Sequence, residues 1–303
     1  MALKQILETV NKVKGNFNRI INLTLYTDLG LPFEIKCPTK GRKPNIEING
    51  SFVNQSEMQA FNITIKNLYL NLITQNYVRV RVQAGYEGNM VAFEGRIFSL
   101  YQESPGPEGS TVIQCKYGKI EDFIDGMVQV NYAPGALLRN VLLEISKKIQ
   151  TTGVHTGLAA GALVLKEPLQ YDGSARGLIN RLQQLYADEE LSIFVRGNEL
   201  CAISEKGGDF VNAYTLQYLS APPQPSAGGQ DGTAYMTLTA PWDPRYRRGD
   251  LLTVPARVYM KNLTLVNSQN NKTQTILITA LSFHFATTGS ANSMTVQGPI
   301  KRK

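Results

Sequence analysis

The stretch S-A-R-G-L-I-N-R-L-Q-Q-L-Y-A-D-E-E-L-S-I-F-V-R-G-N-E-L-C-A-I-S, from Ser174 to Ser204, changes its hydrophobic period in the middle. Up to Ala187 the apolar residues recur at the spacing of an amphipathic helix, and their shared face consists of Leu178, Ile179, Leu182, Leu185 and Tyr186. Two short apolar runs then flank Arg196, Gly197 and Asn198, a turn sequence typical of a β-hairpin. The stretch therefore predicts a helix over 174–187, followed by a hairpin that ends at Ser204.

A second helix is expected upstream of this stretch. Pro134 can occupy the first turn of a helix, where its missing N–H costs little. The apolar stripe that follows consists of Leu137, Leu138, Val141, Leu142, Ile145 and Ile149. The two helices and the hairpin together predict a small α/β domain over residues 131–207.

Both flanks of this domain have the period of two that is typical of half-buried strands. In residues 20–130, Phe61, Ile63 and Ile65 alternate with polar residues, and turns rich in Gly and Pro separate the runs. In residues 208–303 the same alternation returns, for example in Y-M-T-L-T and in T-I-L-I-T-A-L-S-F-H-F. The chain is therefore predicted to be mainly β, with an antiparallel sheet or barrel on each side of the α/β domain.

Two further segments complete the predicted organisation. Residues 1–19 are expected to form an N-terminal amphipathic helical arm, with a face made of Leu3, Ile6, Leu7, Val10 and Val13. The Pro- and Gly-rich segment 221–232 suits neither a helix nor a strand and is predicted to be an exposed loop.

Net charge, cysteine positions and the lengths of apolar runs limit which kinds of protein and partner the sequence suits. The formal charge of +7 favours anionic partners, but the basic residues are scattered, which is weak support for a nucleic-acid groove. Cys37, Cys115 and Cys201 each lie in an apolar run and are expected to be reduced core residues of a protein made in a cytoplasm. The charged N-terminus does not have the pattern of a secretory signal, and no run approaches the length of a membrane span.

Catalytic constellations are not evident in the sequence. The chain has two histidines, His155 and His284, far apart, which leaves little material for histidine-based acid–base chemistry or for a multi-histidine metal site. Adjacent carboxylates such as Glu189 and Glu190 are expected to be solvated, and no nucleophile or phosphate-binding motif is present. We therefore expect no enzymatic activity, no cofactor and no metal site.

The stretch D-P-R-Y-R-R-G-D-L-L-T-V-P, from Asp243 to Pro255, contains the tripeptide Arg-Gly-Asp. Gly249 and Asp250 suit a tight turn, and the alternation that starts at Leu252 predicts a strand immediately after it. A turn is therefore expected rather than an adhesion ligand. The neighbouring Arg245, Arg247 and Arg248 are candidates for an interface between subunits or for the rim of a channel, because arginine is favoured at interfaces.

The order of these elements resembles the baseplate hub proteins of bacteriophage tails, a gp27-like family that includes late-control tail proteins and the N-terminal half of type VI secretion spike proteins. The similarity covers nearly all of the chain after the first 19 residues and is carried by several stretches. They are P-G-A-L-L-R-N-V-L-L-E-I-S-K-K-I, the helix and hairpin of 174–204, R-R-G-D-L-L-T-V-P, L-I-T-A-L-S-F-H-F-A-T-T-G, and the strand pair around Y-V-R-V-R-V-Q-A-G-Y-E-G.

The resemblance implies two tube-like antiparallel β-barrels that flank the helix-and-hairpin domain. It also implies a structural role in the virion: a homotrimeric, pseudo-sixfold ring that connects the tail tube protein to the tip or spike protein, lines the channel for passing DNA, and is assembled in the host cytoplasm. Two alternatives stay open. One is a distal tail adaptor or tube terminator built on the same barrel, and the other is an OB-like nucleic-acid-binding protein.

Overall fold

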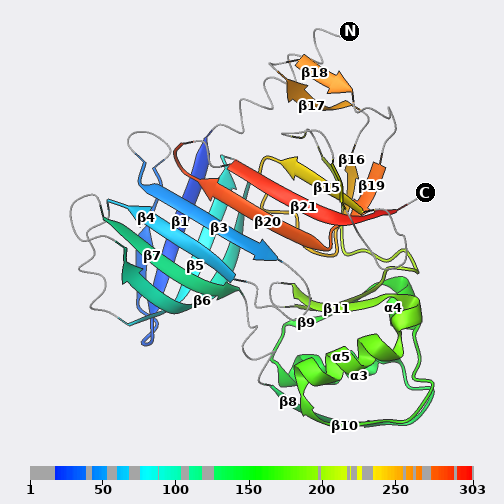
Figure 1. Cartoon of the computed structure of the whole chain (residues 1–303). Coiled ribbons are helices and arrows are strands. Elements are labelled where there is room, and N and C mark those ends of the chain that lie inside the picture. Colours follow the sequence, from blue (N-terminus) through cyan, green and yellow to red (C-terminus); the bar gives the residue numbers. More distant parts are fainter. Residues whose placement is uncertain are drawn as a thin grey trace.

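The structure is a computed structural model of the whole chain (Figure 1). It describes residues 18–38, 43–52, 60–67, 76–87, 89–103, 109–117, 126–196, 199–216, 219, 224–226, 235–254, 257–261, 264–267, 274–289 and 292–301. The helical arm was predicted over residues 1–19. All but the last two of these residues lie outside the described part of the chain.

The first β region is an antiparallel sheet whose strands follow the order β3-β4-β7-β6-β5-β1-β2. Its members are β1 (Arg19–Thr27), β2 (Pro32–Ile35), β3 (Asn45–Phe52), β4 (Ala60–Lys66), β5 (Tyr77–Tyr86), β6 (Asn89–Gln102) and β7 (Ser110–Tyr117). The predicted alternation is confirmed: Phe61, Ile63 and Ile65 are buried, whereas the polar residues between them point to the other face.

The second β region is built from the C-terminal third of the chain. Its strands are β13 (Ala213–Thr215), β14 (Gln224–Ser226), β15 (Tyr235–Ala240), β16 (Leu251–Val254), β19 (Gln274–Leu277), β20 (Ala280–Ala286) and β21 (Asn292–Lys301). A separate pair consists of β17 (Arg257–Lys261) and β18 (Thr264–Asn267). Of the loop predicted over 221–232 the structure describes Gln224–Ser226, which is a short strand paired with β15 and not a loop; the other residues of that prediction lie outside the described residues.

The two β regions share one sheet, because β3 pairs with β20 in antiparallel register from Leu281 opposite Phe52 to Ala286 opposite Glu47. Aromatic side chains reinforce this connection: the Trp242 ring lies 4.5 Å from that of Phe285, and the Tyr86 hydroxyl donates to the Trp242 carbonyl. Among the described residues no closed barrel is found, so the expectation of two separate barrels is replaced by a continuous sheet with one shared core.

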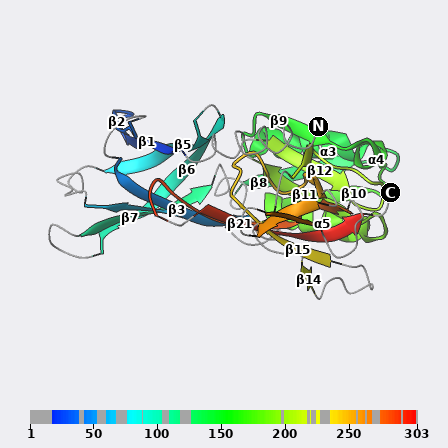
Figure 2. The same cartoon turned by 90° about the horizontal axis from the view of Figure 1, so that it is seen from above.

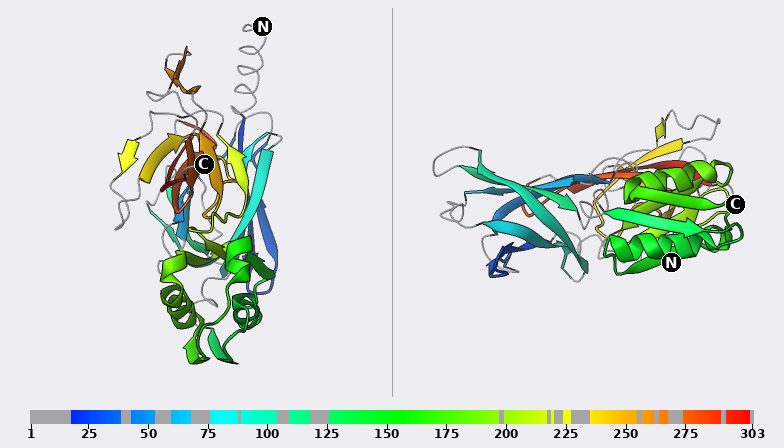
Figure 3. Two further views of the ribbon diagram at one scale, coloured as in Figure 1. Left: turned by 90° about the vertical axis from the view of Figure 1, so that its right-hand side faces the viewer. Right: turned by 90° about the horizontal axis from the view of Figure 1, so that it is seen from below.

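The small α/β module has a core of its own. It contains β8 (Met127–Tyr132), α3 (Leu138–Lys148), β9 (Gly153–Thr156), α4 (Leu158–Ala162), β10 (Leu169–Ser174), α5 (Ala175–Leu185), the 3₁₀ turn η2 (Ala187–Glu189), β11 (Leu191–Arg196) and β12 (Glu199–Ser204). Strand β8 pairs with β10, and β9 extends the β11–β12 hairpin in parallel. In the left view of Figure 3 this module lies below the β regions, with a helix toward each of its two sides.

The predicted helix and hairpin of residues 174–204 are confirmed. Ser174 caps α5, and its hydroxyl accepts from the Gly177 N–H, which satisfies one of the free donors at a helix N-terminus. Leu178, Ile179, Leu182 and Tyr186 are buried as the spacing indicated, whereas Leu185 of the predicted face is 47% exposed.

Two details of the prediction for this module are wrong. Pro134 lies in a turn before α3 and not in its first turn, and the helix starts four residues later, at Leu138. Strand β8, most of which the prediction placed in the first β region, belongs to the module by its pairing and by the burial of Val128 and Val130 in the module's core.

The three cysteines are free and buried, as the apolar runs predicted. Burial raises the pKa of Cys201 to about 12, which leaves its thiol protonated and unreactive at neutral pH. In the part of the chain that the structure describes, no helix is long and apolar enough to cross a membrane.

Candidate functional site: the arginine loop at the small module

The loop between β15 and β16 holds the Arg-Gly-Asp tripeptide in two successive turns. Asp243 starts the first turn, where its carboxylate accepts from the Arg245 N–H at 3.0 Å and its carbonyl from the Tyr246 N–H. The Asp250 N–H then donates to the Arg247 carbonyl at 3.2 Å, across Gly249. The prediction of a tight turn followed by a strand is confirmed, since β16 begins at Leu251.

Gly249 is required in this turn for two reasons. Its φ of +83° belongs to the left-handed region that favours glycine. A Cβ at this position would also lie 2.5 Å from Cζ of Phe194, a residue of β11 in the small module. The backbone of the turn therefore packs directly against the module's hairpin.

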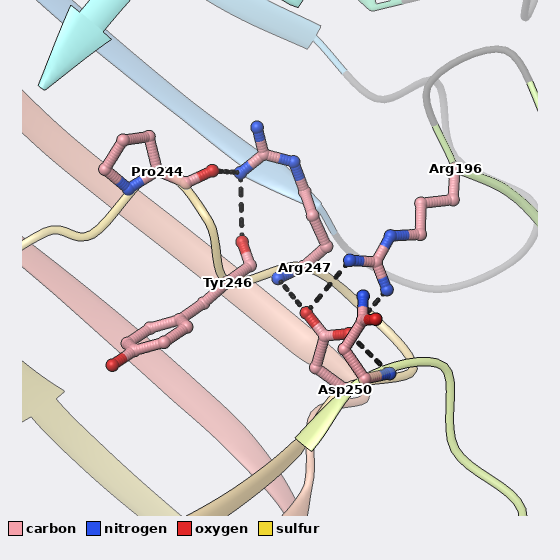
Figure 4. Close-up of polar contacts among 6 residues, drawn as sticks. Arg196, Pro244, Tyr246, Arg247 and Asp250 are labelled. Atoms are coloured by element: carbon pink, nitrogen blue, oxygen red, sulfur yellow. Dashed lines mark hydrogen bonds and ion pairs between the residues drawn. The ribbon is translucent and has the colours of Figure 1, made fainter. Parts of the chain in front are cut away.

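Asp250 is fully buried and collects hydrogen bonds from three residues (Figure 4). Its carboxylate accepts from the Arg247 N–H at 2.9 Å and from the Asn212 N–H at 3.2 Å. Arg196, at the end of β11, donates a hydrogen bond from Nη1 to Oδ1 at 2.5 Å and from Nη2 to Oδ2 at 3.2 Å. This bidentate pair is the strong form of an ion pair and ties the small module to the second β region.

Burial and hydrogen bonding act on the Asp250 carboxyl in opposite directions. Burial raises the pKa of Asp250 above its ordinary value, because a charged carboxylate is poorly solvated there. The hydrogen bonds from Arg196, Arg247 and Asn212 oppose that rise. Charge on Asp250 is therefore tolerated only while its partners are in place.

Arg247 and Arg248 leave the loop toward different parts of the molecule. Arg248 donates to the Ser192 hydroxyl at 2.9 Å, and its guanidinium lies 4.8 Å from the centre of the Phe194 ring. Desolvation by burial lowers the pKa of Arg248 to about 10. Arg247 donates to the carbonyls of Pro244 and Tyr246, and its guanidinium lies 5.9 Å from the centre of the Phe93 ring in β6. The loop thus contacts the small module and the first β region at once.

The three arginines proposed for an interface or a channel rim therefore lie in different environments. Arg247 and Arg248 are buried within the chain. The Arg245 side chain is 42% exposed and forms an ion pair with Asp243. Of the three, Arg245 is the one that reaches the surface, and the rim role remains a prediction for that residue.

Asp209 holds the turn after β12 against α4, at the point where the chain leaves the module. Its carboxylate accepts from the N–H groups of Ala159 and Ala160 at the start of α4 and from the Ser204 N–H at the end of β12. Gly157 leaves room for this side chain, since a Cβ there would lie 2.2 Å from Cγ of Asp209. The turn after β12 is therefore fixed before the chain reaches the arginine loop.

The sequence did not indicate the Arg196–Asp250 pair or Asp209. The local sequence predicts that Asp250 lies in a turn, but not which residue it pairs with. Its partner Arg196 lies 54 residues away, so the spacing of nearby residues does not indicate the pair. The one signal was the acidic residue at the end of an arginine cluster, immediately before an apolar strand.

The two histidines occupy structural positions. His284 in β20 pairs with Glu47 in β3 across the connection between the β regions, with the imidazole side chain 46% exposed. His155 lies in β9, opposite Cys201 of β12. No group of three or more His, Cys, Asp or Glu residues could hold a metal ion within the described part of the chain.

Comparison with solved structures connects this architecture to a class of proteins. No family model matches the chain, and no curated protein matches it in sequence. A tail protein from Neisseria meningitidis MC58 aligns over 92% of this chain and 96% of its own length, with a TM-score of 0.56 and 8% identity. The 43 kDa tail protein of prophage MuSo2 from Shewanella oneidensis aligns over 94% and 98%, with a TM-score of 0.57 and 10% identity.

A third solved structure extends the class beyond phages. The E. coli c3393 protein, a component of the type VI secretion system described as similar to the T4 tail proteins gp27 and gp5, aligns over 86% of this chain and 74% of its own. Its TM-score is 0.53 and its identity 10%. The chain therefore has the fold of phage tail proteins and of their type VI secretion counterparts, as the resemblance in the sequence implied.

Proposed function

We propose that this chain is a structural protein of a phage tail or of a related injection device. The observation that carries the proposal is the extent of the shared fold: two tail proteins align over more than nine-tenths of this chain and of their own length. An arginine loop that ties the small module to the β regions fits a part that bears load. A non-enzymatic role agrees with the same comparison, because those relatives are tail proteins.

Within that role, we propose a hub that joins the tail tube protein to the tip or spike protein. Three copies would form a pseudo-sixfold ring around a channel for DNA, with each copy contributing its two β regions to a sixfold tube. Closed rings are the usual form of such oligomers, because a head-to-tail contact repeats until it closes. The protein would then reside in the virion tail after assembly in the host cytoplasm.

The test is the position and copy number of the chain in purified particles. Electron microscopy of assembled tails, with the chain labelled by a C-terminal tag, should place it between tube and tip in three copies. Six copies at the same place would support a distal adaptor or tube terminator instead. Particles that lack the chain altogether, although its gene is expressed, would contradict the structural role.

A further inference from the structure

The outer side of the first sheet carries an excess of positive charge. Strands β4 to β7 direct their apolar residues into the core and leave on the outer side a set that we call the basic face: Lys66, Arg79, Arg81, Arg96 and Lys116. Three of them lie directly opposite one another on neighbouring strands, Arg79 with Arg96 and Arg96 with Lys116. Like charges in such positions repel each other.

Negative charge on this face is sparse. Within the described strands β4 to β7, Glu94 is the single acidic residue, and its Oε2 lies 3.8 Å from Nη1 of Arg79. A partner surface that carries negative charge would therefore be attracted to this face.

Exposed aromatic residues accompany the basic face. Phe98 lies at the bulge of β6 with 52% of its surface exposed, and the Lys116 ammonium is 5.5 Å from the centre of its ring. Tyr101, opposite Val112, is 42% exposed. Arginine with tyrosine and phenylalanine is the composition that protein–protein interfaces favour.

A surface of opposite character lies at the end of the small module. Asp188, Glu189, Glu190 and Glu205, which we call the acidic end, lie together because the Glu205 N–H donates to the Glu190 carbonyl. Lys206, whose ammonium donates to the Asp188 carbonyl, is the one cation among residues 187–190 and 205–206.

This second surface also has exposed apolar residues. Leu158 and Phe210 are 94% and 41% exposed. Asp209 holds them near each other, since its carboxylate binds the N–H groups of the two residues that follow Leu158 and its backbone precedes Phe210. Each of the two surfaces therefore combines charge of one sign with apolar groups.

The two surfaces belong to opposite ends of the molecule. Strands β5 to β7 lie at the left in Figures 1 and 2, whereas α4 and the adjoining start of β11 lie at the right. They cannot meet within one chain but can meet between two copies. We propose that the basic face of one copy docks on the acidic end of the next, a head-to-tail contact of the kind that closes into rings. The inference rests on the proposed ring-forming role.

Reversal of charge on each surface tests this contact. One variant carries Arg79→Glu and Arg96→Glu, a second carries Asp188→Lys and Glu189→Lys, and a third carries all four substitutions. Sedimentation at about 50 mM salt should show self-association of the wild type that weakens with added salt, because screening shortens the reach of surface charges. Each double variant should lose association at least tenfold, and the quadruple variant should regain it.

Controls separate the contact from other effects of charge. Lys147→Glu with Lys148→Glu makes the same change in charge on α3 and should leave association unchanged, and circular dichroism checks that each variant is folded. A wild type that stays monomeric at low salt, or a quadruple variant that stays apart, would overturn the proposal. So would loss of binding to labelled single-stranded DNA by Arg79→Glu with Arg96→Glu while self-association persists, since the basic face would then serve nucleic acid. None of these results affects whether the chain is present in tails, which the particle analysis decides separately.

Discussion

At the scale of single residues, Asp250 explains why the Arg-Gly-Asp tripeptide is not an exposed ligand. Its carboxylate has no exposed surface, and Arg248 of the same tripeptide is also buried. A receptor that reads this tripeptide needs both charged side chains in solvent. The structure instead assigns them to contacts within the chain, with Ser192 and with Arg196.

Removal of the Arg196 guanidinium should leave Asp250 as an uncompensated buried charge. We expect Arg196→Met to lower stability by about 3 kcal/mol at pH 7, because breaking a buried ion pair costs on the order of 3–5 kcal/mol and Arg196 is partly exposed. Thermal unfolding should show a decrease in Tm of roughly 5–10 °C. Asp250→Asn in the same background should recover part of the loss, since it removes the unpaired charge.

The pH dependence of the Arg196→Met variant gives an independent readout. Burial places the folded pKa of Asp250 above the unfolded value of 3.8, and without Arg196 it rises further. A folded state that binds the proton more tightly gains stability as pH falls through that window. The deficit of the variant should therefore be largest at pH 7 and shrink toward pH 4. Arg245→Met, which breaks the more exposed pair with Asp243, is the control and should cost less than about 1 kcal/mol at every pH.

At the scale of elements, Gly249 shows how one turn holds a hairpin in place. Gly249→Ala should destabilise the protein by about 2–4 kcal/mol, from the positive φ and from the contact of the new Cβ with Phe194. Gly289→Ala is the matched control, because Gly289 has a φ of +76° and a Cβ there would meet no atom within 4 Å. Chemical denaturation should show the smaller cost of about 1 kcal/mol for the control. Equal losses in the two variants would contradict packing of the turn against β11.

Helices and strands of this protein were predictable from the sequence where a single local pattern determines them. The period of two located β4 and β5, and the helical spacing of the apolar residues after Ser174 located α5, because those signals depend on residues a few positions apart. Pro134 misled the prediction for α3, since proline suits a turn as well as a first helical turn. Strand β14 was missed because Pro225 lies within it, and proline is tolerated in a strand only at an edge such as this one.

At the scale of the whole molecule, the sequence could not predict how the β regions join. The pairing of β3 with β20 brings together residues far apart in the chain, such as Glu47 and His284, which are 237 positions apart. Neither strand has a local sequence signal that identifies the other as its partner. The candidate site could not be predicted either. Arg196 and Asp250 come together only when the small module packs on the sheet, and no local pattern in the sequence indicates that contact. The overall architecture was accessible through the order of elements, which the solved tail proteins share.

The shared sheet predicts that strands far apart in sequence open together. Amide hydrogen exchange of the native protein should give similar protection for Ile48 in β3 and for Phe285 in β20, because each strand supplies the other's hydrogen bonds. The buried aromatic contact of Phe285 with Trp242 should raise both values together. Protection of β3 that persists while β20 exchanges freely would show that the first β region is stable alone.

The pairing of β3 with β20 also has a consequence for biosynthesis. A ribosome that adds roughly 5–20 residues per second needs on the order of 10–50 s to pass from Glu47 to His284, which are 237 residues apart. During that interval β3 has its partner β4 on one side only, and its other edge is open to strands of any neighbouring nascent chain. Production of this protein at high level should therefore depend on chaperones that shield that edge until β20, in the last tenth of the chain, emerges.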